Sequence, residues 1–316
     1  MTGPAETLPR STSRVATEVV AAVDIGGTRI KAALVDRSYA VLAQATTPTP
    51  SDIGADIGGA VAATVKALLG SVPSGQAARL VGCGVVVPGL VDEEQGVGVY
   101  SANLSWRDLD IRAQVQSFLG LPAVVGHDVR AGLLAESRLG AARGHRQVLF
   151  MPLGTGIAGA LLLDGSVVSG DGWAGELGHV VIDPSGPTCP CGQRGCLEVL
   201  ASAGAIERIY GAQSPEPLSA EDIAARAAAG EPLASSVWAG AVRSLGQAIV
   251  MTVTLTGVDL VLVGGGLAQS GEVLLRPLRE DVSGRLTFQR PPTIQRAGLG
   301  DRAGSLGAAC LIWDSL

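Results

Sequence analysis

The sequence predicts an α/β protein that is long enough for two domains. Its 316 residues are enough for two domains and a large buried core. Short apolar strands alternate along the chain with segments of helical periodicity. A strand–glycine turn–strand unit also occurs twice, about 130 residues apart, and such a recurrence indicates an internal duplication. Two related halves would place their glycine turns opposite each other across a cleft.

The composition indicates a compact globular protein and excludes several classes of partner. Hydrophobic residues make up 47% of the chain and charged residues 16%. The formal net charge is -6 and Lys and Arg do not cluster, which argues against a nucleic-acid or anionic-membrane partner. Aromatic residues are 3%, too few for a base-stacking platform. The longest apolar run, Ala248–Val263, is interrupted by polar residues and predicts no membrane span.

The chain ends and the isolated cysteines indicate an intracellular setting. Residues 1–18 contain no apolar segment of signal-peptide length, and we expect a disordered N-terminal lead-in there. Cys83 and Cys310 lie in apolar stretches and predict buried free thiols, which are typical of a reducing compartment. We therefore expect a cytoplasmic protein.

The first glycine unit predicts a hairpin between two apolar strands, residues 19–23 and 32–35. Gly26 and Gly27 form its turn, where backbone without side chains can approach a phosphate and offer N–H groups to it. Asp24 ends the first strand and could hold a hydrated Mg²⁺. The alternative is an ordinary Gly-Gly hairpin with no ligand.

The second glycine unit repeats this pattern. An apolar strand at 148–153 is followed by Gly154, Thr155 and Gly156, then by a second strand at 157–163 and an acidic residue. Two such hairpins facing each other across a cleft could hold one nucleoside triphosphate from both sides.

A helix at 56–69 and strands at 81–87 and 97–100 lie between the two units. A polar loop follows the last of these strands and contains Asn103. Its amide could hydrogen-bond a polyol, although an Asn in a loop more often stabilises a turn.

Asp128 lies at the junction between a strand at 123–126 and a helix at 129–142. Asp is a favoured helix N-cap, so this residue could serve only the helix. A carboxylate between a strand end and a helix start could also project into the cleft and accept a hydroxyl proton. The two roles are compatible.

Three of the five cysteines fall within eight residues, at Cys189, Cys191 and Cys196, and His179 lies ten residues upstream. Three thiolates and an imidazole form the closed four-ligand set of a tetrahedral structural zinc site. The alternative is a chance cluster of free cysteines.

Two carboxylates accompany this cluster. Glu176 precedes His179 by three residues, so on a helical turn the two side chains share a face. Glu198 follows the last cysteine of the cluster. A metal bound there would brace a polar pocket containing both glutamates without taking part in the chemistry.

The rest of the chain predicts a helical region, an apolar strand at 259–263 and a final helix. The strand leads into Gly264, Gly265 and Gly266, a loop against which a flat nucleoside can lie, although such loops are common. The expected helices span residues 201–210, 220–229, 235–256 and 304–313.

The motifs DIGGT, LGTG, AGELGH, CPCGQRGCLE and VGGGL, in this order, resemble the family of bacterial repressors, open-reading-frame proteins and sugar kinases called ROK. The resemblance runs from about Val20 to the C-terminus. It implies the actin-like (ribonuclease H-like) sugar kinase fold, with two α/β domains of mixed β-sheets flanking a central cleft. We expect a small domain at 19–125, joined by the C-terminal helix at about 301–316, and a large domain with the zinc motif at 126–300.

The resemblance also implies roles for individual residues. Asp128 would take the proton from the sugar 6-hydroxyl, and His127 stands where family kinases usually have Asn. The expected sugar-binding residues are Asn103, His127, Asp128, Glu176, His179 and Glu198. The residues expected to bind ATP with Mg²⁺ are Asp24, Gly26, Gly27, Thr28, Lys31, Gly154, Thr155, Gly156, Gly264, Gly265 and Gly266.

The expected function is therefore ATP-dependent phosphorylation of glucose at its 6-hydroxyl. The alternative is a kinase for an N-acetylhexosamine, either N-acetylglucosamine or N-acetylmannosamine, although the bulk of His127 narrows the site. A sugar-responsive ROK regulator is the third reading, and fewer than twenty-five residues before Asp24 leave no room for its winged helix. We expect a homodimer or homotetramer that binds a small sugar and a nucleotide.

Overall fold

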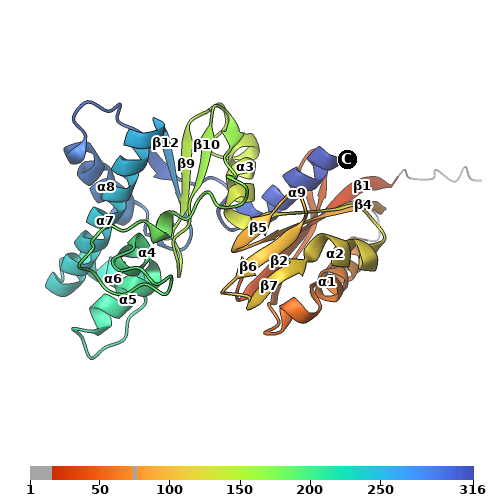
Figure 1. The fold of residues 1–316 in the computed structure, drawn as a ribbon, viewed down its shortest axis with the longest axis horizontal. Coiled ribbons are helices and arrows are strands. Elements are labelled where there is room, and N and C mark those ends of the chain that lie inside the picture. Colours follow the sequence, from red (N-terminus) through yellow and green to blue (C-terminus); the bar gives the residue numbers. More distant parts are fainter. Residues whose placement is uncertain (1–15, 74–76) are drawn as a thin grey trace, which may run out of the picture.

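The computed structural model describes residues 16–73 and 77–316, which form two lobes side by side (Figure 1). Each lobe is centred on a five-stranded mixed sheet, and in this part of the chain the two sheets have one plan. The first has strand order β3-β2-β1-β4-β8 and the second β11-β10-β9-β12-β13. In both sheets the first three strands pair antiparallel, and the last two strands in the order run parallel to the third. The predicted internal duplication is confirmed.

The strand bounds agree with the predicted hairpins. The first sheet contains β1 (Thr17–Ile25), β2 (Arg29–Asp36), β3 (Val41–Pro48), β4 (Ala78–Val87) and β8 (Ala123–His127). The second contains β9 (Val148–Pro152), β10 (Ala160–Leu163), β11 (Ser166–Val167), β12 (Leu260–Gly264) and β13 (Thr293–Arg296). A smaller sheet beside the first comprises β5 (Leu90–Asp92), β6 (Val97–Ser101) and β7 (Trp106–Asp110).

The first sheet is buried on both faces, which explains why β1 is an almost continuous apolar run. Val19, Ala21 and Val23 point to the face covered by α1 (Ile57–Ser71) and α2 (Ile111–Leu119). Val20 and Ala22 point to the opposite face, where α9 (Ala303–Ser315) packs. Successive strand side chains alternate between faces, so each face receives its own set of small apolar residues.

The second lobe has the same layered arrangement. One face of its sheet packs on α3 (Asp128–Leu139), and the other packs on a group of helices that includes the 25-residue α7. The bounds of that group are α4 (Leu197–Ala201), α5 (Ala203–Gly211), α6 (Ala220–Ala228), α7 (Pro232–Thr256) and α8 (Glu272–Arg285).

Two helices pass between the lobes. α3 follows the last strand of the first sheet but packs on the second, whereas α9 follows the last strand of the second sheet and packs on the first. The helices meet at Gly307, where a Cβ atom would overlap the carbonyl oxygen of Ala131. Only glycine permits this backbone approach, so a substitution at 307 would push the lobes apart.

Some expectations need correction. Residues 1–15 of the expected lead-in lie outside the described residues, and Thr17 and Glu18 already belong to β1. The sequence did not predict several shorter or less regular elements, namely α2, α4, α8, β3, β5, β7, β11 and β13. The domain boundary expected at 125/126 stays a prediction, and β8 runs across it without a break.

Two composition-based expectations also have structural outcomes. Cys83 and Cys310 are buried free thiols, as predicted. Within the described ranges, none of the helices has the length and apolar character needed to cross a membrane.

The first testable prediction concerns Glu136, which is fully buried near the end of α3. Its carboxylate accepts hydrogen bonds from the backbone N–H groups of Ala141, Gly298 and Leu299 at 2.8, 3.1 and 2.7 Å. It thereby fastens the segment that enters α9 to α3. Glu136→Ala leaves three buried donors without an acceptor, so we expect a loss of about 3 kcal/mol in the free energy of unfolding.

Urea unfolding measures this loss, and Glu280→Gln, on the exposed side of α8, is the control that should change little. A Glu136→Ala protein as stable as the wild type would show that the carboxylate does not hold the two helices together.

Candidate active site

The first glycine turn joins β1 to β2 in the first sheet. Gly26 donates its N–H to the carbonyl of Arg29 at 2.9 Å, and its own carbonyl accepts from the Thr49 hydroxyl at 2.7 Å. Asn103 lies against this turn, because a Cβ atom at Gly27 would be 3.7 Å from Asn103 Cβ. The first lobe therefore brings together the predicted phosphate turn and one predicted sugar ligand.

The other two glycine turns lie next to each other in the second lobe. They follow β9 and β12, which are adjacent parallel strands and so end at the same edge of the sheet. Leu153 donates its N–H to the Gly264 carbonyl at 2.9 Å, and Leu267 donates to the Leu153 carbonyl at 3.1 Å. Within the 154–156 turn, Gly154 donates to Gly156 at 3.0 Å. From the sequence we expect both turns to bind the same nucleotide. In the structure the two turns lie side by side, at the ends of neighbouring strands.

Asp24 is the carboxylate at the end of β1, and it packs against Gly304 at the start of α9. The pKa of Asp24 is raised to about 7, mainly by burial and then by the negative charge of Asp128, while the positive charge of Lys31 opposes the rise. The negative charges of Asp24 and Asp128 repel each other. A divalent cation bound between them would relieve this repulsion and favour the ionised form of both carboxylates. The residues present therefore fit Mg²⁺.

Asp128 is the first residue of α3, but the helix cap is His127. His127 keeps the extended backbone that an N-cap needs, and its Nδ1 accepts from the N–H groups of Val129 and Arg130 at 3.2 and 3.4 Å. The N-cap is therefore His127, one residue before the Asp128 suggested by the sequence. Asp128 also accepts from Val129, at 2.7 Å, through Oδ1.

These contacts determine the state of His127. The imidazole is 6% exposed, and burial lowers its pKa, although the negative charge of Asp128 opposes this. Because Nδ1 accepts two N–H groups, the ring is neutral and the hydrogen resides on Nε2. His127 can therefore accept for the helix with Nδ1 and donate with Nε2.

The cysteine cluster forms in space as predicted. The ligand atoms of His179, Cys189, Cys191 and Cys196 all lie within 4.8 Å of one another. Cys191 Sγ is 3.6 Å from Cys196 Sγ, and Cys189 Sγ is 3.7 Å from His179 Nδ1. A tetrahedron with zinc–sulfur bonds of about 2.3 Å has edges of about 3.8 Å, so the cluster fits zinc.

Both predicted carboxylates lie beside this cluster. His179 directs Nδ1 to the cysteines and Nε2 toward Glu176, whose Oε2 is 3.9 Å away. Glu198 is in the first turn of α4, and its Oε2 accepts the N–H of Ile157 at 2.9 Å. The Glu198 carboxylate is thereby tied to the second glycine turn, which leaves its other oxygen for a ligand.

The two halves of the predicted sugar site also approach each other. Arg130, two residues after Asp128, donates to the carbonyls of Gly172 and Ala174, which lie just before Glu176 in the chain. The negative charges of both Asp128 and Glu176 act to raise the pKa of His127. Sequence reasoning missed Glu93 and Arg130, which pair beside them at 3.0 Å. An Arg two residues after Asp128, within an otherwise apolar helical stretch, was the only signal for this pair.

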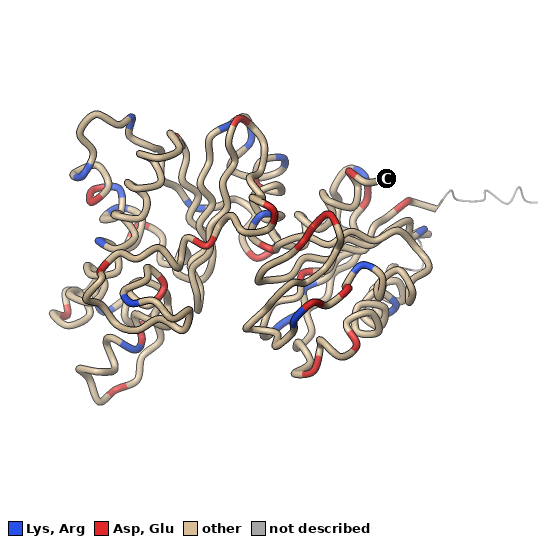
Figure 2. The backbone as a smooth tube through the Cα atoms, viewed as in Figure 1, with Lys and Arg blue, Asp and Glu red and all other residues tan. Residues whose placement is uncertain are grey.

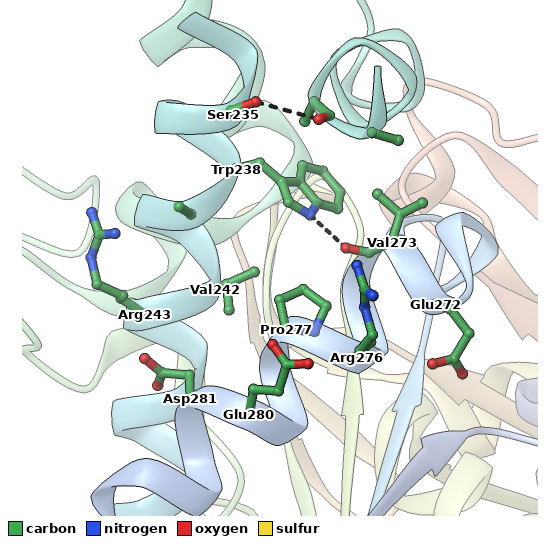
Figure 3. Close-up of a pocket in the computed structure, with 13 residues that line it drawn as sticks. Ser235, Trp238, Val242, Arg243, Glu272, Val273, Arg276, Pro277, Glu280 and Asp281 are labelled. Carbon is green, nitrogen blue, oxygen red and sulfur yellow. Dashed lines mark hydrogen bonds between the residues drawn. The ribbon is translucent and has the colours of Figure 1, made fainter. Parts of the chain in front are cut away.

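A large groove lies away from these residues. It has a volume of about 840 Å³ and runs between α7 and α8 (Figure 3). Trp238 lies on one wall and donates its indole N–H to the Val273 carbonyl at 3.0 Å, while Arg276 and Glu280 lie on the other. None of the predicted site residues lines this groove, so its size does not make it the active site.

Comparison with known proteins agrees with this geometry. The sequence profile of the ROK family matches residues 20–315. A glucokinase of Thermotoga maritima is 34% identical over 309 residues, 92% of this chain and 96% of that protein.

Two solved structures show the same fold. A ROK family glucokinase from Streptomyces griseus, in complex with glucose and AMPPNP, has a TM-score of 0.78 at 29% identity and covers 93% of this chain and 98% of its own. A ROK family transcriptional regulator, a homologue of the E. coli MLC protein, has a TM-score of 0.84 at 27% identity and covers 93% and 77%.

The likeness extends over nearly the whole chain and therefore over both lobes. The actin-like sugar kinase fold expected from the sequence is confirmed, and this chain belongs to the ROK family.

Proposed function

We propose that this protein is an ATP-dependent kinase that transfers the γ-phosphate to the 6-hydroxyl of glucose. The observation that carries the proposal is the position of Asp128. It lies close enough to Asp24 of the first glycine turn to raise the pKa of that residue, and close enough to His127 to form a 3.4 Å contact. A base between a phosphate turn and a group of sugar ligands is the arrangement that phosphoryl transfer to a hydroxyl requires.

Asp128 would act as the general base. Its carboxylate takes the proton of the 6-hydroxyl as the oxygen attacks the γ-phosphorus, and ADP leaves. Because the transition state of phosphoryl transfer is loose, positioning and charge neutralisation contribute most of the acceleration. When bound with ATP, Mg²⁺ would supply neutralisation, and Asp24 is the residue placed to hold its hydration shell.

The phosphates of ATP would be bound mainly by backbone. The turns at 26–28 and 154–156 offer N–H groups from the two lobes, with the hydroxyls of Thr28 and Thr155 beside them. Lys31, whose Nζ lies 3.6 Å from Asp301 Oδ2, adds a positive charge. The nucleoside would lie against Gly264–Gly266.

The sugar would be bound by side chains of complementary character. His127 donates from Nε2, and His179 donates from Nε2 when its Nδ1 binds metal. Glu176 and the remaining oxygen of Glu198 accept, and Asn103 can do either. A neutral hexose with equatorial hydroxyls matches this mixture of donors and acceptors, which is why we place glucose before an N-acetylhexosamine.

We also propose that His179, Cys189, Cys191 and Cys196 hold one structural Zn²⁺. All four ligands come from the protein, which leaves no open position for a reacting group. The ion would fix the orientation of His179 and, through it, the place of Glu176.

A regulatory function is the second candidate, because the structural likeness to a ROK transcriptional regulator is close. Basic and acidic residues are interspersed over both lobes, and no basic stripe follows any element in the part of the chain drawn (Figure 2). This distribution offers no electrostatic footprint for DNA, so we place catalysis first. A cytoplasmic location and a homodimer or homotetramer stay predictions.

The second testable prediction is that Asp128→Asn lowers kcat by at least about 100-fold, because the amide cannot accept the hydroxyl proton. Glucose binding should stay within a few-fold of the wild type, since size and shape are kept. Steady-state kinetics and calorimetry measure the two quantities. If Asp128→Asn keeps most of the wild-type kcat, another residue is the general base and Asp128 has only a structural role.

The third prediction concerns the metal. We expect one Zn²⁺ per chain, and Cys191→Ser should lose it together with thermal stability and glucose affinity. Elemental analysis, thermal unfolding and calorimetry measure the three effects. Cys310→Ala, a free cysteine outside the cluster, should keep the metal. An active protein that contains no zinc would rule this site out.

The fourth prediction tests the function itself. We expect the highest kcat/KM with glucose when glucose, mannose, N-acetylglucosamine and N-acetylmannosamine are compared with ATP as the donor. A site built to bond a hydroxyl rejects an analogue that lacks that partner, so the preference should be sharp. An acetylated sugar that exceeds glucose tenfold would overturn the glucose assignment. If the protein phosphorylates none of the four sugars and shifts the DNA upstream of its own gene in a gel, the regulatory function would be favoured instead.

A further inference from the structure

Arg130 is a charged side chain buried between the two lobes. It lies two residues after Asp128 in α3 and is 3% exposed. A guanidinium taken out of water is costly unless charged and polar partners surround it. Arg130 is used by none of the steps derived above, so its burial needs a separate reason.

The partners of Arg130 come from both lobes. Its Nε donates to Glu93 Oε1 at 3.0 Å, and Glu93 lies in the turn between β5 and β6. Its Nη1 donates to the carbonyls of Gly172 and Ala174 at 3.4 and 3.2 Å. One guanidinium thus joins the small sheet of the first lobe to the loop that precedes Glu176 in the second.

The same carboxylate oxygen has a second partner. Glu93 Oε1 also accepts the backbone N–H of His127 at 3.0 Å. The ion pair is therefore in contact with His127, which adjoins the proposed base, and with the loop that ends at Glu176.

The 170–175 loop has an unusual backbone. Gly170, Asp171, Gly172 and Gly175 have positive φ values of 53, 53, 90 and 108°, a region that glycine adopts readily and other residues adopt less often. A Cβ atom at Gly172 would overlap the carbonyl oxygen of Val91 in β5. The loop therefore touches the other lobe at the point where Arg130 holds it.

We propose that Glu93 and Arg130 form a latch between the lobes that sets the distance from Glu176 to His127 and Asp128. Arg130 is then a positioning residue for sugar binding, an inference that rests on the proposed role of Glu176 as a sugar ligand. The latch acts through the 172–174 backbone, so its removal loosens the loop and weakens the sugar more than the nucleotide.

The planar guanidinium is essential to this arrangement. Its donors point in different directions, so Nε serves the carboxylate while Nη1 serves the two carbonyls. Lysine keeps the positive charge but concentrates its donors on a single atom. Arg130→Lys therefore separates the geometry of the latch from the charge of the site.

The test combines hydrogen–deuterium exchange with kinetics on the full-length zinc-bound protein. In Arg130→Lys we expect faster exchange across residues 170–176 and a KM for glucose raised at least about tenfold, with kcat and the KM for ATP changed less than about threefold. Glu93→Gln, at a carboxylate one third exposed, should change both quantities in the same direction and is the second variant if Arg130→Lys does not fold.

Arg138→Lys is the matched control. Arg138 lies in the same helix and forms two hydrogen bonds with Asp314, at 2.7 and 2.6 Å, away from the sugar residues. The Arg138→Lys substitution should lower thermal stability without changing hydrogen–deuterium exchange in residues 170–176 or the KM for glucose.

Two results would overturn the latch. One is unchanged exchange at 170–176 in both Arg130→Lys and Glu93→Gln. The other is an equal rise in the KM for glucose in Arg138→Lys, which would mean that general stability alone is responsible. If the wild-type protein phosphorylates no hexose, the proposed function fails while the exchange comparison still decides whether the latch exists.

Discussion

The backbone contact between α3 and α9 is the constraint on which the site depends. The two helices meet at Gly307 and Ala131 without an intervening side chain, and each packs on the sheet of the lobe from which it does not come. Asp128 begins α3 and Asp24 packs against the first turn of α9. One of the two carboxylates therefore begins one helix of the pair, and the other, on β1, packs against the second helix.

The electrostatics of the cleft follow from this placement. Asp24 has a pKa near 7 because it is buried and faces Asp128, whereas His127 is neutral because its Nδ1 serves the helix backbone. Full ionisation of both Asp24 and Asp128 would place two negative charges near each other, an arrangement that a cation accompanying a phosphorylated substrate would stabilise. Backbone N–H groups would bind phosphates, and side chains would bind the sugar, so the two ligands are recognised by different chemistry.

The segment that contains Glu176 has little regular structure of its own. Between β11 and α4 it includes only the short 3₁₀ turn Leu177–His179 among the described elements. It is held on one side by Arg130, which binds the 172–174 carbonyls, and on the other by the cysteine cluster that includes His179. A segment made mostly of turns can present a carboxylate accurately when both of its ends are fixed.

The sequence by itself determined the repeated hairpins, the cysteine cluster and the candidate base, because each depends on residues close together in the chain. Glycine spacing, cysteine spacing and an acidic residue after an apolar strand are local signals, and the structure places them where they were expected. Tertiary structure alone decided the cap at His127, the contact of Glu198 with Ile157 and the Glu93–Arg130 pair. Glu198 and Ile157 are 41 positions apart in the chain, and Glu93 and Arg130 are 37 positions apart. Such pairs arise only when separate elements pack, since periodicity describes which face of an element is buried but not which element covers it.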